Sequence, residues 1–554
     1  MNGYKIQFHY PFSRRMMSFF TACAMMCLCA TSGSAANVAD KANAPQARMG
    51  INLAPLVDWG TEQPFVDIFR LSRLWASQQK GTSWGKGPAL ELDEHGWVKK
   101  LEQDCWAETI LCNIPGDHYP SGRYTILYEG KGTFDVTHAA KVVDASKPGR
   151  IIIDVDASKG GIHLRLLTTD PQNYIRNIRV IKPGFEATYQ TEPFDPVFLR
   201  RWKGVACIRF MPWMMSNDLD TVRWDERTRV NDASFAVKGA PLEVMIDLCN
   251  RQKADAWFSL PYAADDDYVR NFAAMVKERL DPSLKVYVEY TNEAWNSGFK
   301  SSRHVKQKAK ELGLGNPSMP WEGGCLYYRQ RSLEIFKIWE NVFGRKDRLV
   351  RVLAWQAASS SFWLDGLLMS KVQPGDVDAL AVGPYISVLV PDTSKNPDEV
   401  TADKVATWTV DQVLDYTEKV KLPECVQWMH NAADVARKHH VRLIAYEAGQ
   451  HLVGIRNGMN NEQMTQLFIQ ANAHPRMGQI YTQYFDAWQK AGGELMCVFE
   501  SVSRWSKYGS WGLMQFPNEN ESASPKFLAT MRWAKSLGQN VNVSDSRGAS
   551  PRVP

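Results

Sequence analysis

Two glutamates that follow strand-like runs are the residues whose positions most clearly suggest chemistry. Residues 286–290 are β-branched and aromatic and lead to Glu293, and residues 441–446 lead in the same way to Glu447. Catalytic side chains collect on loops at the ends of rigid strands. Two carboxyl groups are the minimum apparatus for breaking a glycosidic bond, because one protonates the leaving oxygen while the other meets the positive anomeric carbon. The pattern therefore indicates acid–base chemistry on a sugar.

Eight strand-like runs, separated mostly by helical patterns, would position these glutamates. Apolar residues in 265–280, for example, recur with the spacing of one helical face. Eight alternating strand and helix units predict an α/β fold, a closed parallel (β/α)8 or TIM barrel. Glu293 then follows the fourth strand and Glu447 the seventh. The eight runs are residues 50–53, 207–211, 256–260, 286–290, 349–353, 377–382, 441–446 and 495–499.

The stretch from 101 to 190 interrupts the barrel pattern. It holds short strand-like runs at close spacing, separated by glycine-rich turns. Such a texture predicts a small all-β module inserted between the first and second barrel strands. The barrel is accordingly expected at 49–100 and 191–537, and residues 538–554 are expected to form a C-terminal tail.

Residues 1–36 have the pattern of a signal peptide. Arg14 and Arg15 precede the apolar run 16–30, and small residues follow it, which is the order of a charged region, a hydrophobic region and a cleavage site. The apolar run is too short to span a bilayer comfortably. We therefore expect an exported protein, secreted or periplasmic, with no membrane insertion after the signal is removed and with a flexible leader at 37–48.

The composition limits the classes of partner. The chain has 65 basic and 60 acidic residues, and its formal net charge is +5. No basic stripe suggests binding to nucleic acid or to an anionic membrane. The chain has 20 tryptophans, whose flat faces suit stacking on sugar rings, although many are expected to fill the core. Seven cysteines lie beyond the signal, too few and too scattered for a disulfide framework. Cys105 and Cys112 could still pair across a short loop. The oligomeric state stays open.

A barrel with Asn-Glu after its fourth strand and Glu-x-Gly after its seventh resembles the clan A glycoside hydrolases, the 4/7 superfamily of retaining enzymes. The resemblance covers residues 50–516 apart from the insertion, and it does not reach a family defined by substrate. It implies that Glu293 is the acid/base and that Glu447 is the nucleophile. It also implies that Asn292 hydrogen-bonds the sugar 2-hydroxyl.

The two glutamates need different surroundings for these roles. Glu293 must be protonated near neutral pH, so its pKa must be raised by an apolar surround or by the charge of Glu447. Glu447 must stay ionised, which a neighbouring arginine and a tyrosine hydroxyl would favour. Arg209 in the second strand and Tyr385 after the sixth are candidates, and both resemble positions that the clan uses around its nucleophile.

Further residues near the expected mouth of the barrel are candidates for contact with the sugar. Trp355 follows the fifth strand, and Trp505 and Trp511 follow the eighth, where the clan commonly has a sugar-stacking aromatic; packing explains such residues equally well. Glu500 is a third acid at the end of the eighth strand, where it could bind a sugar hydroxyl or hold Arg504. No pattern indicates a metal site, a nucleotide or an organic cofactor.

The sequence thus predicts an exported, metal-independent glycoside hydrolase that acts on a carbohydrate and retains the anomeric configuration. In that case the carboxyl groups of Glu293 and Glu447 should lie about 5–5.5 Å apart. Two alternatives stay open. A non-catalytic carbohydrate-binding protein on the same fold would use the β-rich insertion and the tryptophans for binding. A transglycosylase would pass the sugar to another sugar.

Overall fold

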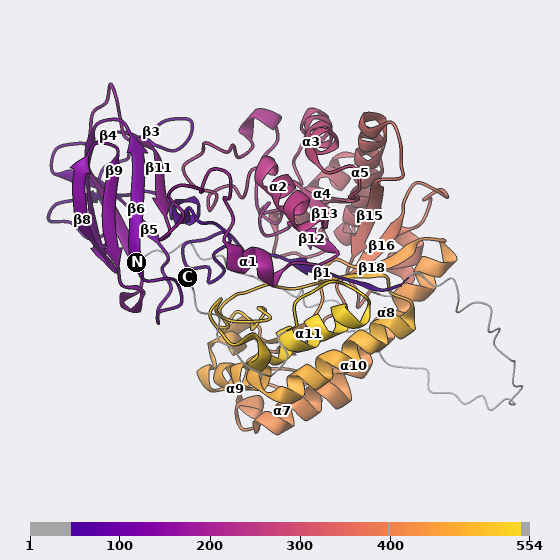
Figure 1. Cartoon of the computed structure of the whole chain (residues 1–554). Helices are drawn as coiled ribbons and strands as arrows, with labels where there is room; N and C mark the ends of the chain where they lie inside the picture. The colour runs from indigo at the N-terminus through magenta and orange to yellow at the C-terminus, as the bar shows by residue number, and fades with distance from the viewer. Residues whose placement is uncertain (1–45, 360, 397–398, 544–554) are drawn as a thin grey trace, which may run out of the picture.

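A computed structural model of the chain describes residues 46–359, 361–396 and 399–543 (Figure 1). The expected signal peptide and most of the expected leader lie outside the described residues, as does the end of the expected tail, residues 544–554. Within the described part of the chain, no helix has the length and apolar character needed to cross a membrane.

The predicted barrel is confirmed: eight parallel strands close into a ring in the order of the chain. Each strand falls on one of the eight predicted runs, so Glu293 follows the fourth strand and Glu447 the seventh. The strands are β1 (Arg48–Asn52), β12 (Cys207–Arg209), β13 (Asp255–Leu260), β14 (Val286–Tyr290), β15 (Leu349–Trp355), β16 (Ala379–Val382), β18 (Arg442–Ala445) and β20 (Leu495–Val498).

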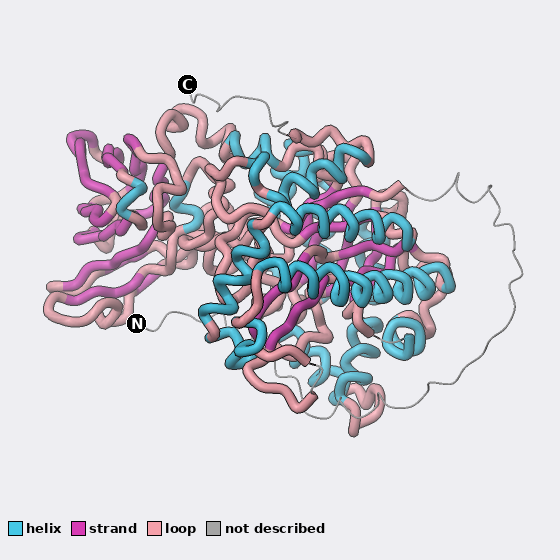
Figure 2. The backbone as a smooth tube through the Cα atoms, turned by 90° about the horizontal axis from the view of Figure 1, so that it is seen from below, coloured by secondary structure: helices cyan, strands magenta, loops and turns pink. Residues whose placement is uncertain are grey.

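Helices surround the barrel strands (Figure 2). They are α1 (Pro196–Arg201), α2 (Leu242–Gln252), α3 (Asp266–Arg279), α4 (Lys300–Glu311), α5 (Pro320–Phe343), α6 (Ala402–Ala406), α7 (Val410–Tyr416), α8 (Leu422–Lys438), α9 (Glu462–Ala473), α10 (Pro475–Ala491) and α11 (Pro525–Ser536). Short 3-10 turns are η2 (Ile68–Leu71), η3 (Ala157–Lys159), η4 (Trp224–Glu226), η7 (Arg456–Asn460) and η8 (Glu521–Ala523), and π-helical turns are η5 (Phe362–Leu368) and η6 (Thr417–Lys421).

The barrel interior is filled by side chains, as is usual for this fold. The rings of Trp257 and Tyr287 stack inside it with centroids 5.3 Å apart, and both are fully buried. Ile444 and Tyr446 belong to the same interior cluster. The barrel interior is therefore a packed core, and an active site is expected on the loops at its C-terminal end.

Two four-stranded antiparallel sheets occupy the chain between β1 and β12, and we call them together the β module. One has the order β2 (Ala76–Gln79), β5 (Cys105–Leu111), β10 (Ile162–Thr169), β7 (Gly132–His138). The other has the order β11 (Arg176–Ile181), β6 (Gly122–Glu129), β9 (Arg150–Val155), β8 (Ala140–Lys147). A small hairpin joins β3 (Glu91–Leu92) to β4 (Val98–Lys100). The module begins before residue 101, because β2 pairs with β5.

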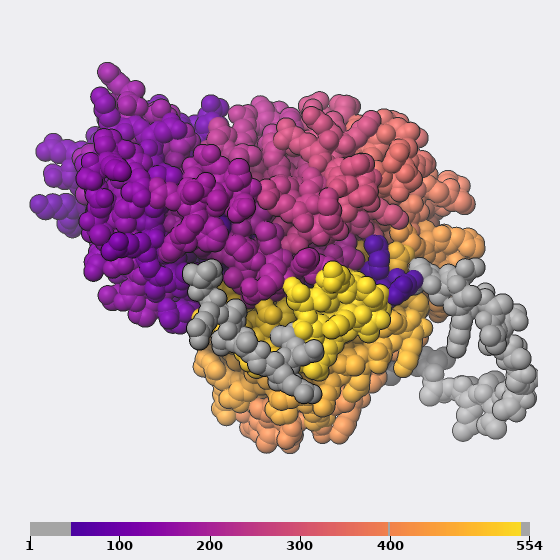
Figure 3. All heavy atoms as spheres, in the orientation of Figure 1, coloured from indigo at the N-terminus to yellow at the C-terminus, as the bar shows by residue number. Residues whose placement is uncertain are grey.

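The β module packs beside the C-terminal mouth of the barrel, in violet in Figures 1 and 3. It contacts the loops that follow three barrel strands. Asn113 donates its N–H to the carbonyl of Asp58 after β1, and His95 accepts at its carbonyl from the N–H of Ala233 after β12. The ring of His118 stacks on Phe516 after β20, with centroids 3.5 Å apart. The module therefore borders the region that holds the two glutamates.

Two further features differ from the expectation. Strands β17 (Ile386–Val390) and β19 (Gln450–Gly454) form a parallel pair beyond β16 and β18. The considered disulfide does not form, since Cys105 and Cys112 are buried with free thiols. Cys105 begins β5 and Cys112 directly follows its last residue, so the extended strand separates them by roughly 20 Å, whereas a disulfide needs Cα atoms within about 7 Å.

Candidate active site

Four of the expected site residues meet around the guanidinium of Arg209, which is fully buried. Its Nη1 donates to Glu447 Oε1 at 3.0 Å, and its Nη2 donates to Asn292 Oδ1 at 2.7 Å. The hydroxyl of Tyr385 donates to the other oxygen of Glu447, Oε2, at 2.9 Å. Strands two, four, six and seven of the barrel thus deliver these side chains to one point.

Glu289, a residue that sequence reasoning missed, anchors Arg209 from inside the barrel. Its carboxylate is fully buried and accepts from Arg209 Nη2 at 3.0 Å, from Trp257 Nε1 at 2.8 Å and from Ser259 Oγ at 2.8 Å. A charge inside the wholly buried strand β14 was the available signal. Because Glu289 neutralises Arg209 and fixes its plane, the remaining N–H groups point at Glu447, Asn292 and Asn52.

Glu293 has a different environment, since both of its oxygens accept from neutral donors. Oε1 accepts from the hydroxyl of Tyr446 at 3.1 Å, and Oε2 accepts from Asn296 Nδ2 at 2.9 Å. Burial, followed by the negative charge of Glu447, raises the pKa of Glu293 to about 8, and the two hydrogen bonds oppose that rise. At neutral pH the carboxyl of Glu293 is therefore protonated.

The backbone that presents Glu293 is strained. Thr291 and Glu293 have φ angles of 52° and 39°, in the left-handed region that residues with a Cβ seldom adopt. Such conformations persist only where the surroundings impose them, and they cluster at functional sites. The surrounding structure therefore holds the loop after β14 in a strained conformation that fixes the direction of the Glu293 side chain.

Glu447 is the better charge-stabilised of the two carboxyls. Burial raises its pKa above the ordinary value, while the charge of Arg209 and the hydroxyl of Tyr385 pull it down. The hydrogen bonds to Glu293 come from the neutral side chains of Tyr446 and Asn296, so the proton resides on Glu293 and the negative charge on Glu447. Two carboxyls whose environments separate their pKa values in this way can act as an acid and a nucleophile.

Tyr446 connects the two glutamates and was also missed by sequence reasoning. It precedes Glu447 on the chain and hydrogen-bonds Glu293, and the guanidinium of Arg209 lies 5.1 Å from its ring centroid. The hydroxyl end of the ring lies against Gly383, where an added Cβ would stand 3.0 Å from the tyrosine oxygen. The absence of a side chain at Gly383 thus permits the position of Tyr446.

Two predicted sugar contacts are buried within the protein instead. Trp355 is 3% exposed and packs against Tyr328 and Trp363, with ring centroids at 5.7 and 6.3 Å. Trp505 is 7% exposed, donates Nε1–H to the carbonyl of Gly512 and carries the Lys526 ammonium 4.4 Å above its ring. Their faces are occupied by protein atoms, so packing is the role that the structure gives them.

Trp511 is the tryptophan that lies close to the nucleophile position. Its ring centroid is 5.6 Å from that of Tyr385, 5.6 Å from that of Phe499 and 4.5 Å from that of His451. It is half-buried, unlike Trp505. Trp511 therefore offers the aromatic surface expected after the eighth strand.

Glu500 sits beside the same region but is tied into the protein. It is 5% exposed, and burial raises its pKa to about 8, with Ser503 and Lys526 opposing the rise. The charges of Glu62 and Glu447 raise it further, which places Glu500 near the nucleophile position. A protonated carboxyl of this kind can donate a hydrogen bond to a sugar hydroxyl.

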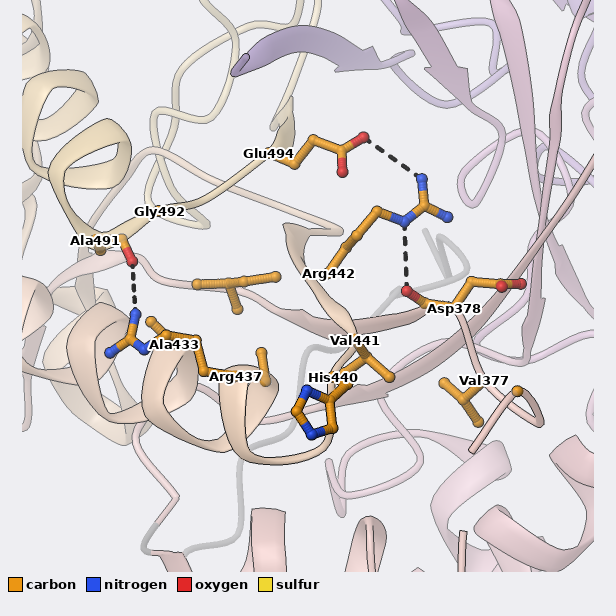
Figure 4. A pocket seen from close by; sticks show the side chains of 13 residues that line it. Val377, Asp378, Ala433, Arg437, His440, Val441, Arg442, Ala491, Gly492 and Glu494 are labelled. Atoms are coloured by element: carbon orange, nitrogen blue, oxygen red, sulfur yellow. Dashed lines mark hydrogen bonds and ion pairs between the residues drawn. The ribbon is translucent and has the colours of Figure 1, made fainter. Parts of the chain in front are cut away.

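A cavity of about 530 Å³ opens at the other end of the barrel (Figure 4). It is lined by Asp378, Val441 and Glu494, which precede strands β16, β18 and β20, and Arg442 reaches toward Asp378 and Glu494 across it. Residues at this N-terminal end serve the stability of such barrels. The cavity is therefore separate from the site of the two glutamates.

No family model matches the sequence, and no curated protein matches it. Among solved structures, a family GH51 arabinofuranosidase from Xanthomonas axonopodis pv. citri aligns with 58% of this chain and 63% of its own at 12% identity and a TM-score of 0.34. A modular endo-β-1,4-mannanase of family GH26 from Cellulomonas fimi aligns with 60% of this chain and 64% of its own, at 12% identity and a TM-score of 0.29.

A GH5-4 broad-specificity endoglucanase from Clostridium longisporum aligns with 60% of this chain and 83% of its own, at 12% identity and a TM-score of 0.34. The alignment thus spans less than two thirds of the arabinofuranosidase and of the mannanase. These families belong to the clan whose motifs the sequence resembles. At such identities and scores, the reaction has to be inferred from the side chains of the site itself.

Proposed function

We propose that this protein is a retaining glycoside hydrolase in which Glu293 is the acid/base and Glu447 is the nucleophile. The observation that carries the proposal is the difference between the electrostatic environments of the two carboxyl groups. Arg209 and Tyr385 hold the charge of Glu447, while burial and that same charge raise the pKa of Glu293 to about 8. A protonated donor beside an ionised nucleophile is the state that the first step of double displacement needs.

In the first step Glu293 gives its proton to the glycosidic oxygen as Glu447 attacks the anomeric carbon. The bond from carbon to the leaving oxygen breaks, and a bond from carbon to a carboxylate oxygen of Glu447 forms. Arg209 and Tyr385 keep the attacking carboxylate in one orientation, which reduces the reorganisation required in the transition state. Asn292, held by Arg209, is placed to meet the sugar beside the reacting carbon.

The second step uses the change of charge produced by the first. Once Glu447 is an ester, it no longer repels a negative charge on Glu293, so the pKa of Glu293 falls from the value near 8. Glu293 is then an effective base: it takes a proton from water while the water oxygen attacks the anomeric carbon. The ester bond to Glu447 breaks, and both carboxyls return to their starting states.

Export belongs to the same proposal. The charged, apolar and small-residue order of residues 1–36 supports secretion or transport to a periplasm, where an enzyme of this type would meet extracellular polysaccharide. The substrate is a carbohydrate; its sugars and linkages are left to experiment.

A substrate screen tests the proposal. Purified protein is incubated with soluble polysaccharides and with aryl glycosides of several sugars, and reducing ends and released phenols are measured. We expect activity on at least one class, loss of it in Glu447→Ala, and a first-formed product with the configuration of the substrate by NMR. Activity that survives in both Glu447→Ala and Glu293→Ala, or an inverted product, would contradict the assigned roles.

A further inference from the structure

The outer face of the sheet β2-β5-β10-β7 carries a row of polar and aromatic side chains. Strand side chains alternate between two faces. Ala107 and Leu111 of β5 belong to the module core, as do Leu164 and Leu166 of β10. The side chains between them on each strand therefore point outward, and they include Trp106, Glu108, His163 and Arg165.

Glu108 organises this face although it lies on the outside of the sheet. It is only 3% exposed, and its carboxylate accepts from Trp106 Nε1 at 3.1 Å and lies 2.6 Å from His163 Nδ1. The ring of Trp106 is thereby held in one orientation while the residue stays partly exposed. A flat aromatic surface fixed by a buried carboxylate is pre-organised for stacking, because little side-chain entropy remains to be lost on binding.

Arg165 is a partly exposed cation that pairs with two carboxylates without hydrogen-bonding either of them. Its guanidinium lies between Glu108 and Asp135 with nitrogen–oxygen distances of 3.6 Å to each, which are beyond hydrogen-bonding length. The Nε–H of Arg165 is buried and has no hydrogen-bond partner among the described residues. The guanidinium carbon is 6.0 Å from the centre of the Trp106 ring, so a partly exposed guanidinium lies beside the aromatic surface.

The face continues to the mouth of the barrel. At the far end of β5, the carbonyl of Ile110 accepts from the N–H of Arg73, and Arg73 binds Asp58 through Nε at 3.1 Å and Nη2 at 2.6 Å. Asp58 and Trp59 lie in the loop after barrel strand β1. Trp59 is 46% exposed, with the Arg73 guanidinium 5.8 Å from its ring centre. From Ile110 to Trp106 the strand itself spans roughly 13 Å.

We propose that this surface is an extension of the substrate cleft that binds a neutral glycan chain as it leaves the mouth of the barrel. We call it the glycan face and define it by Trp59, Arg73, Trp106, Glu108, His163 and Arg165. Aromatic planes suit the apolar faces of sugar rings, and the partly exposed side chains of Arg165 and Asp135 suit their hydroxyls. The proposal rests on the function proposed above.

Charge argues for a neutral ligand rather than an acidic one. The two arginines of the face stand among three carboxylates, those of Asp58, Glu108 and Asp135. An acidic polysaccharide would meet no excess of positive charge here, whereas hydroxyl groups find both donors and acceptors. Binding should accordingly change little with salt, since it does not depend on screened Coulomb attraction.

The test compares a short and a long substrate in Trp59→Ala, Trp106→Ala and the double variant. The short substrate is the aryl monoglycoside that the wild type cleaves best, and the long substrates are hydroxyethyl cellulose, galactomannan, arabinoxylan and linear arabinan. Trp428→Ala is the matched control, because Trp428 is half-buried like Trp106 but lies on helix α8. Circular dichroism and thermal unfolding check that each variant is folded.

We expect kcat/KM on the aryl glycoside to stay within about twofold of the wild type in every variant. On the polysaccharide that serves as substrate, each glycan-face variant should lose about five- to tenfold in kcat/KM and the double variant more; this loss converts to about 1–1.4 kcal/mol for each stacking contact removed. Trp428→Ala should leave both substrates unchanged. An unchanged ratio of long to short substrate in a folded double variant would overturn the glycan face.

A binding measurement separates this inference from the proposed catalysis. Full-length Glu447→Gln protein, with and without the two tryptophan substitutions, is run in native gels containing each neutral polysaccharide or polygalacturonate. Retardation by a neutral polysaccharide that disappears with the tryptophans supports the glycan face even if the wild type cleaves nothing. Cleavage of aryl glycosides without any tryptophan-dependent retardation supports the proposed function and removes the glycan face. Tryptophan-dependent retardation by polygalacturonate alone would overturn the assignment of a neutral ligand.

Discussion

Replacing Tyr446 by phenylalanine should move the alkaline limit of the pH–activity profile upward and leave the acidic limit in place. The Tyr446 hydroxyl donates to Glu293 Oε1 at 3.1 Å, and this hydrogen bond favours the ionised form of Glu293. Phenylalanine keeps the ring beside Arg209 and Gly383 and removes only the donor. The pKa of Glu293 should therefore rise further above its value of about 8.

The size of the shift follows from the hydrogen bond that is lost. A hydrogen bond to a charged group contributes about 1.5–3 kcal/mol, and one pKa unit corresponds to about 1.4 kcal/mol. The second acceptor contact, from Asn296 at 2.9 Å, remains and limits the effect. We expect the pKa of Glu293 to move up by about one unit, so that the acid stays protonated to about pH 9.

The assay is kcat/KM against pH from 4 to 10, since this quantity reports the pKa values of the free enzyme. The substrate needs a poor leaving group, such as an oligosaccharide, because only then does the first step depend on the proton of Glu293. Tyr385→Phe is the matched control. Its hydroxyl donates to Glu447 Oε2 at 2.9 Å, so its loss should raise the pKa of Glu447 and move the acidic limit of the profile upward.

The expected pattern is thus an alkaline limit displaced in Tyr446→Phe and an acidic limit displaced in Tyr385→Phe. Activity at the optimum should fall in both, and more in Tyr385→Phe, which loses a contact to the attacking carboxylate. A profile whose two limits stay in place in Tyr446→Phe would refute the reasoning. So would an alkaline limit that moves down, because it would show that Tyr446 stabilises the protonated form of Glu293.

Two predictions concern stability. Glu289→Gln should lower the free energy of unfolding by about 3–5 kcal/mol, measured by urea denaturation, because it leaves the buried charge of Arg209 without its inner partner; a change within error would mean that Glu447 alone neutralises Arg209. Glu293→Gln should make the melting temperature less sensitive to pH between about 4.5 and 8. The folded pKa of Glu293, about 8, lies above its unfolded value of 4.5, so the wild type loses stability as pH rises through that window and the uncharged glutamine does not. Equal losses between pH 5 and pH 9 in both proteins would contradict the raised pKa.

The barrel could be predicted because its strands carry a strong signal. Strands buried on both faces are nearly continuous apolar runs, and β13, β14 and β15, which are buried at every position, are mostly apolar or aromatic. Strand β2 gave no such signal, because Ala76–Gln79 has no β-branched residue and owes its conformation to pairing with β5. For that reason the expected start of the β module, residue 101, lies after its first strand.

The site was predictable where function depends on position along a strand and not where it depends on packing. The ends of barrel strands located Glu293, Glu447, Arg209 and Tyr385, which the structure brings together. Tryptophans after strand ends give no such guarantee, because only tertiary contacts decide whether a ring face is covered, as it is in Trp505.

Glu289 and Tyr446 were missed for a related reason. Both lie in runs that were interpreted only as strands, and their polar atoms matter through partners on other strands. An isolated charge in an otherwise apolar buried strand is a usable signal for such residues, since an unpaired charge is too costly to bury. A tyrosine beside a nucleophile carries no comparable signal, because its hydroxyl can be satisfied in many ways. The distance between the carboxyl groups of Glu293 and Glu447, expected to be about 5–5.5 Å for a retaining enzyme, stays a prediction.

The most direct measurement is the stereochemistry of azide rescue in the two alanine variants. With an activated aryl glycoside, Glu447→Ala should be inactive alone and should yield a glycosyl azide of inverted configuration, because azide enters the space of the missing nucleophile. Glu293→Ala should still form the ester with Glu447, and azide should then release a glycosyl azide of retained configuration. The same configuration from both variants, or inverted product from Glu293→Ala and retained product from Glu447→Ala, would contradict the roles assigned to these glutamates.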